Sequence, residues 1–72
     1  MPSITKLTED YILEHPSIKD CLKNDLVNFS SLSRKIADEL DLSVKKNFDA
    51  ILIACRRFQR KLKKEETFES RI

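Results

Sequence analysis

The residues that could do chemistry in this chain lie mainly in one basic stretch, Lys45–Lys64, which reads KKNFDAILIACRRFQRKLKK. This stretch holds eight of the fourteen basic residues and one acid, Asp49, so its local charge is +7 in a chain of net charge +2. Its apolar residues recur with a helical period, so one face is expected to be buried while the basic residues occupy a different sector. A cationic face of this kind is typical of surfaces that bind nucleic acid or another polyanion, and it indicates no reaction.

The start of this predicted helix holds the candidates for reading bases. Residues 28–64 have the plan of a helix-turn-helix, in which the first turns of the second helix enter the major groove. Asparagine can pair with adenine there, and lysine can reach guanine or phosphate. The candidates are therefore Lys45, Lys46 and Asn47. The usual glycine is missing from the turn, and Asp49 would repel phosphate.

A second basic cluster lies farther along the same helix, and its members are expected to bind phosphates with salt-sensitive, sequence-independent affinity. It consists of Arg56, Arg57, Arg60, Lys61, Lys63 and Lys64, of which Arg56, Arg57, Arg60 and Lys64 are the expected nucleic-acid contacts. A solvated face of an αα-hairpin is the alternative, because most charged helix faces serve only solubility. Ile53 projects among the basic residues, which predicts burial under the first helix or a contact in a dimer.

The histidine and the two cysteines do not predict a reactive site. Cys21 and Cys55 lie in apolar helical patterns without a CxxC motif, so reduced, buried thiols are expected and a zinc site is not. His15 precedes a proline and is expected to help end the first helix. A Cys-His-Asp arrangement with Asp20 is disfavoured because a buried thiol is inert. We therefore predict no catalytic residues, no metal, no cofactor and no small-molecule site, and we do not expect an enzyme.

The composition predicts a small all-α domain. The chain has 72 residues, of which 40% are hydrophobic and 36% charged, which is typical of a globular protein with one small core. It contains no glycine and no period-2 alternation, so tight hairpins and Gly-rich phosphate loops are excluded. It also has no long apolar run and no signal-peptide pattern, so we expect a cytoplasmic protein with no membrane partner.

Apolar spacing and capping residues predict four helices, at about 4–14, 18–23, 29–40 and 44–64, with a helix-turn-helix-like pair and no substantial β-wing. Residues 1–64 would form one domain, and the weakly periodic residues 65–72 would fray. The first helix should end before Pro16, and Ser17-Ile-Lys-Asp20 resembles a capping box for the second.

The same patterns predict the caps and the core of the second half of the chain. Ser3, Asn28 and Ser43 are the expected N-caps of the first, third and last helices. The stripes of the last two helices point at one seam, so four side chains are expected to be nearly inaccessible. These are Ile36, Phe48, Leu52 and Cys55.

Two segments, HPSIKDCLKNDLVNFSSLSR at 15–34 and NFDAILIACRRFQRKL at 47–62, carry a family resemblance. They resemble a small helix-turn-helix-like domain of uncharacterised prokaryotic proteins, mostly archaeal. The resemblance implies that Ser17–Cys21 and Ala54–Phe58 are signature positions. In some relatives a ligand-sensing ACT-like domain follows, so that domain is missing here or the chain is a fragment. That family has no assigned activity, so the resemblance bears on fold and compartment more than on function.

Two functional hypotheses from different classes follow. The first is a nucleic-acid-binding module, with DNA as the expected ligand. The alternative is a protein-interaction or oligomerisation module of a regulatory protein, acting as a homodimer or on an adjoining regulatory domain. A DNA-binding module should lose affinity steeply with salt, whereas a dimerisation module should melt in a concentration-dependent way.

Overall fold

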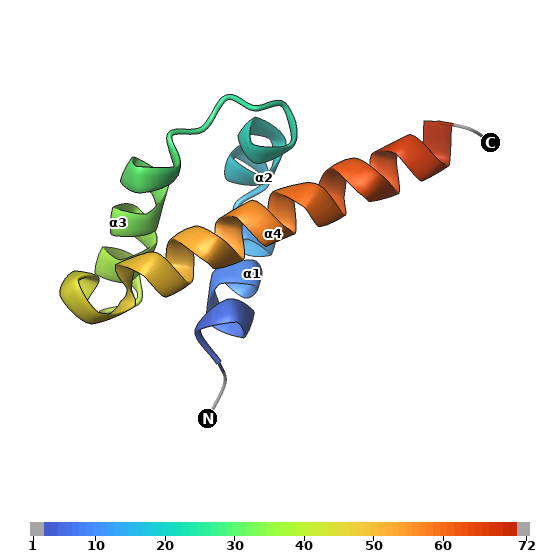
Figure 1. The fold of residues 1–72 in the computed structure, drawn as a ribbon. Coiled ribbons are helices and arrows are strands. Elements are labelled where there is room, and N and C mark those ends of the chain that lie inside the picture. Colours follow the sequence, from blue (N-terminus) through green and yellow to red (C-terminus); the bar gives the residue numbers. More distant parts are fainter. Residues whose placement is uncertain (1–2, 71–72) are drawn as a thin grey trace.

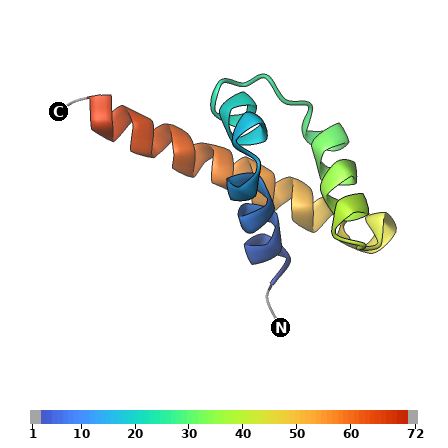
Figure 2. The ribbon, with the colours of Figure 1, turned by 180° about the vertical axis from the view of Figure 1, so that it is seen from behind.

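The computed structural model describes the backbone of residues 3–70 and the side chains of residues 3–64. This part of the chain contains four helices and no strand, which confirms the all-α prediction. The helices are α1 (Ile4–Glu14), α2 (Pro16–Lys23), α3 (Phe29–Glu39) and α4 (Val44–Ser70). Figures 1 and 2 show α4 lying across the others, with its C-terminal part projecting beyond them.

Three of the helix starts follow the predicted caps. The Ser3 hydroxyl accepts a hydrogen bond from the amide of Lys6 at 3.1 Å, and the Asn28 side chain accepts from the amide of Ser31 at 3.0 Å. The Ser43 hydroxyl accepts from the amide of Lys46 at 3.3 Å. These contacts satisfy N–H groups that have no partner inside the helix.

The capping box predicted for α2 is wrong. This helix starts at Pro16 with His15 at the N-cap, and His15 makes no side-chain capping hydrogen bond. Proline is favoured at the first helical position because its fixed φ suits a helix and its missing N–H is not needed there. The same proline ends α1 at Glu14, as predicted.

The last helix is longer than predicted. It runs to Ser70 rather than ending near Lys64, and residues 71–72 lie outside the described residues. The fraying expected for residues 65–72 stays a prediction. Residues 65–70 contain neither glycine nor proline, so no strong helix-stopping signal falls there.

The core centres on α4, against which α1 and α3 both pack extensively. Ile36 and Cys55 are completely buried, as predicted. Phe48 and Leu52 are only half-buried, so that part of the prediction is wrong. The buried places are taken by Ile51 and Ala54, because α4 packs against two helices and its buried sector is turned toward the space between them.

Two large apolar side chains, Leu13 and Ile53, lie at the surface. Ile53 is 50% exposed, which contradicts its predicted burial under the first helix, and Leu13 is 52% exposed. Ile53 precedes the buried Cys55 by two residues, which places it on nearly the opposite side of α4. Leu13 likewise follows Ile12, a fully buried residue, by one position and so turns away from it.

Candidate nucleic-acid interface

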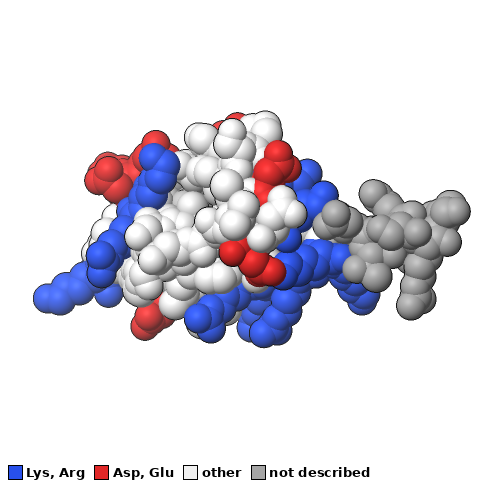
Figure 3. All heavy atoms as spheres, turned by 90° about the horizontal axis from the view of Figure 1, so that it is seen from above, with Lys and Arg blue, Asp and Glu red and all other residues white. Residues whose placement is uncertain are grey.

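The exposed side of α4 forms a continuous surface, here called the outer face. It comprises the exposed α4 residues from 45 to 64, most of which are basic. These are Lys45, Lys46, Asp49, Ala50, Ile53, Arg56, Arg57, Arg60, Lys61 and Lys64. Figure 3 shows basic side chains along the lower edge of the molecule in that view and further basic side chains at its left side. The helical rise of about 1.5 Å per residue spreads this surface over roughly 28 Å.

The basic residues of the outer face differ from Lys6, Lys35 and Lys63 in how they are paired. On α1, Lys6 pairs with Asp10 at 3.2 Å, and on α3, Lys35 pairs with Glu39 at 3.6 Å. Lys63, at the border of the outer face, pairs with Asp25 at 2.5 Å. Among the described side chains, no carboxylate pairs with a cation of the outer face. The positive charge of this surface is therefore not neutralised by ion pairs within the described part of the chain.

The first turn of α4 presents two of the three predicted base-reading residues. Lys45 and Lys46 are exposed on the outer face. Asn47 is half-buried, and its amide donates a 3.0 Å hydrogen bond to the Ser43 carbonyl. Asn47 therefore does not share the exposed position of the two lysines. Its side chain is bonded to the backbone at the start of α4 instead.

Two arginine–phenylalanine contacts join α3 to α4. The Arg56 guanidinium of α4 lies 5.6 Å from the centre of the Phe29 ring of α3. In the opposite sense, Arg34 of α3 lies 5.9 Å from the centre of the Phe48 ring of α4. Both are cation–π contacts, and both leave the arginine exposed. Sequence reasoning missed Arg34, because its signal, a basic residue on the outward side of the scaffold helix, is common and unspecific.

A hollow of about 300 Å³ opens beside the second of these contacts, between α3 and the start of α4. Arg34 is its contribution from α3, and the remaining lining residues come from the first two turns of α4. The complete lining is Arg34, Val44, Lys45, Phe48 and Asp49. The hollow thus combines an aromatic ring, two cations and one carboxylate.

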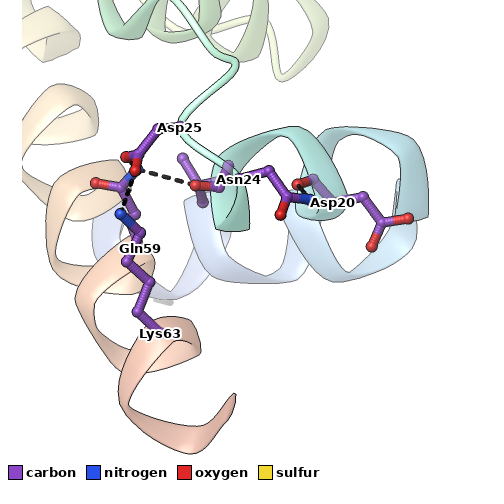
Figure 4. Close-up of polar contacts among 6 residues, drawn as sticks. Asp20, Asn24, Asp25, Gln59 and Lys63 are labelled. Carbon is purple, nitrogen blue, oxygen red and sulfur yellow. Dashed lines mark hydrogen bonds and ion pairs between the residues drawn. The ribbon is translucent and has the colours of Figure 1, made fainter. Parts of the chain in front are cut away.

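A polar bridge fixes α4 against the link between α2 and α3 (Figure 4). The Gln59 amide donates to the Leu22 carbonyl at 2.9 Å and to the Asp25 carboxylate at 2.8 Å. Lys63 donates to the other oxygen of the same carboxylate. Asn24 stays within its own turn, because its amide donates to the Asp20 carbonyl at 2.8 Å. The bridge holds the part of α4 that carries the second basic cluster. No sequence pattern reveals this bridge.

The single histidine, His15, contacts Tyr11 at the end of α1. The His15 ring stacks on Tyr11 with centroids 4.1 Å apart, and its Nδ1 lies 2.7 Å from the Tyr11 carbonyl oxygen. The Tyr11 hydroxyl donates to the Glu39 carboxylate and so ties α1 to α3. These contacts hold the His15 ring at the end of α1.

The two cysteines are free thiols. Burial raises the pKa of Cys55 to about 11, and the hydrogen bond with Ser33 opposes that rise. At neutral pH the Cys55 thiol is therefore protonated and a poor nucleophile. Cys21 is half-buried on α2 rather than fully buried.

Neither a metal centre nor a membrane span emerges from the described residues. No group of three or more His, Cys, Asp or Glu residues is placed there to hold a metal ion. No described helix is long and apolar enough to cross a membrane. Comparisons with protein-family models, curated proteins and solved structures gave no match to this chain. The family resemblance of the two sequence segments therefore stays a prediction.

Proposed function

We propose that this chain is a small, non-enzymatic nucleic-acid-binding module that contacts duplex DNA through the outer face of α4. The observation that carries the proposal is the contrast in ion pairing. Lys6 and Lys35 are matched by carboxylates on their own helices, whereas the cations of the outer face have no carboxylate partner among the described side chains. Unneutralised cations along one helix face supply the phosphate contacts that dominate nucleic-acid affinity.

The arrangement of α3 and α4 supports a helix-turn-helix-like docking mode. A connection of four residues, 40–43, joins the two helices, and the lysines of the first turn of α4 face outward. In this mode the start of α4 would enter the major groove, with Lys45 and Lys46 near bases or phosphates. Arg57, Arg60 and Lys64 would contact phosphates farther along. Arg56 would contribute less freely, because its guanidinium already makes a cation–π contact with Phe29.

The test is a titration of the isotopically labelled protein with duplex DNA at two salt concentrations, followed by NMR. Amide signals of the outer face should shift, and the affinity should fall steeply with salt. Replacing Lys45 and Lys46 with Ala should weaken binding and lower the salt slope by about 0.9 for each lost phosphate contact. Arg57→Ala with Arg60→Ala should weaken binding equally for every DNA sequence.

The matched control removes two lysines elsewhere, Lys6 and Lys19 on α1 and α2. This variant undergoes the same change of net charge and should retain the binding and the salt slope of the outer face. If excess duplex and single-stranded nucleic acid at low salt leave the outer-face signals unmoved, the proposal is wrong. Equal losses of DNA affinity in the control and in the Lys45/Lys46 variant would show that binding is only nonspecific attraction by net charge.

A second candidate function is a protein-interaction module, and the exposure of Ile53 favours it. This side chain is 50% exposed, and the exposed Ala50 lies one turn before it within the cationic surface. An acidic amphipathic partner would match both the apolar centre and the charged surroundings, whereas two copies docked face to face would oppose like charges. Saturable binding of an acidic amphipathic helical peptide that is lost in Ile53→Asp would support this candidate, whereas melting temperatures that rise with protein concentration would point to self-association instead.

A further inference from the structure

The lining of the hollow between α3 and the start of α4 includes an arginine–phenylalanine contact. The Arg34 guanidinium lies over the half-buried Phe48 ring, 5.9 Å from its centre, and both line the hollow. Aromatic rings and guanidinium planes are the groups on which proteins stack unpaired bases. A base held within a duplex presents its edges in the grooves and not its faces, so this surface fits a base that has left the stack.

The two charged residues of α4 in the hollow have opposite preferences. The Lys45 ammonium can bind a phosphate, while the Asp49 carboxylate repels one. A carboxylate accepts hydrogen bonds at two oxygens and donates none when ionised. Lys45 and Asp49 together are therefore matched by a ligand that presents a phosphate to the lysine and N–H donors to the carboxylate. A nucleotide has both.

We propose that this hollow is a subsite for a single unpaired nucleotide, with a preference for guanine. This inference rests on the proposed function and names one ligand class for part of the same surface. The ring N–H and the adjacent amino group of guanine can donate to the two Asp49 oxygens together. Cytosine and adenine offer one amino group, and uracil or thymine places carbonyl oxygens on both sides of its single ring N–H. The volume of about 300 Å³ matches the lower end of small-ligand sites.

Nucleoside monophosphates test this directly, with GMP, CMP, AMP and UMP titrated separately at low salt and followed by NMR. The amides of Arg34 and of residues 44–49 should shift, and GMP should bind about tenfold more tightly than UMP, since one good bidentate contact discriminates by about 5- to 150-fold. Arg34→Lys keeps the charge and removes the stacking plane, so it should weaken all four nucleotides together.

Asp49→Asn is the decisive variant, because Asp49 is exposed and its replacement should leave the fold intact. The GMP-to-UMP ratio should fall to near one. Asp20→Asn, on α2 outside the hollow, makes the same change of net charge and should leave the ratio unchanged. If Asp49→Asn strengthens all four nucleotides by the same factor, Asp49 is only a phosphate repellent and the inference is wrong.

The duplex titration separates failure of this inference from failure of the proposed function. Shifts at Lys46, Arg57 and Arg60 with duplex DNA, together with silence of the hollow toward every nucleotide, would overturn the subsite and leave the DNA-binding surface standing. Silence of both surfaces would overturn both. Shifts confined to the hollow would support the subsite and direct the proposed function from duplex to single-stranded nucleic acid.

Discussion

Two corners of this molecule share one backbone motif. At the corner after α2, Asp25 has a φ of 60°, and at the corner after α3, Asp41 has a φ of 56°. In both, the next residue donates back across the helix end: Leu26 to the Cys21 carbonyl and Leu42 to the Ala37 carbonyl, each at 2.8 Å. This is the Schellman motif, with aspartate in the left-handed position that glycine usually takes.

The side chains around the two motifs differ completely. After α3, Leu42 packs against the core, while the Asp41 carboxylate has no hydrogen-bond or ion-pair partner among the described residues. After α2, Leu26 is 75% exposed, while the Asp25 carboxylate binds Gln59 and Lys63 of α4. One corner is therefore fixed by apolar packing and the other by a polar bridge to a distant helix.

The comparison shows that an identical local conformation can be stabilised by different forces. A Schellman motif commonly gains an apolar contact from the residue that follows the left-handed position. Where that residue is exposed, as with Leu26, the corner needs another tie, and Asp25 provides it. The two corners should consequently respond in opposite ways to the loss of an apolar group and to the loss of a charge.

The largest expected difference concerns the two leucines. Leu42→Ala should lower the free energy of unfolding by about 1–2 kcal/mol, somewhat below the range for fully buried leucines, because Leu42 is only partly buried. Leu26→Ala should change it by less than about 0.5 kcal/mol, since that side chain is mostly in water. Urea unfolding of both variants measures these two changes in free energy. Equal losses would contradict the proposed difference between the two corners.

The features that sequence predicted well are local ones. The caps Ser3, Asn28 and Ser43 and the end of α1 before Pro16 each depend on residues within one turn of each other. The prediction that the elements are helices and not strands followed from the apolar period and from the absence of glycine. The left-handed aspartates were harder, because asparagine and aspartate only tolerate that conformation and sequence does not say when they adopt it.

The features that sequence missed depend on contacts between distant elements. The rotation of α4, which buries Ala54 and leaves Leu52 only half-buried, follows from packing against two helices at once. In the candidate site, the basic face was predictable from helical period. The pairing of Arg34 with Phe48 and of Gln59 with Asp25 was not, since each joins residues of separate helices or turns.

The second prediction concerns charge at the two corners. Asp25→Asn keeps a residue that tolerates the left-handed conformation but removes the charge facing Lys63, so stability should fall by about 0.5–1 kcal/mol at low salt. The loss should shrink in high salt, which screens exposed pairs. Asp41→Asn should be neutral within about 0.3 kcal/mol, since no ion pair is lost. A similar loss in both variants, independent of salt, would show that the Asp25 bridge contributes nothing particular.

The smallest expected effect uses glycine to separate backbone strain from side-chain contacts. Asp41→Gly should raise the free energy of unfolding by about 0.5 kcal/mol, because glycine adopts a positive φ without the steric cost that aspartate carries, although it also gains entropy in the unfolded chain. Asp25→Gly relieves the same strain but removes the contacts with Gln59 and Lys63, so it should be neutral or destabilising. The quantity to measure is the free energy of unfolding in urea of each variant relative to the wild-type protein, and the difference between the two changes. If glycine stabilises both corners equally, the Asp25 bridge is an incidental surface contact, and the distal part of α4 is positioned by its apolar face alone.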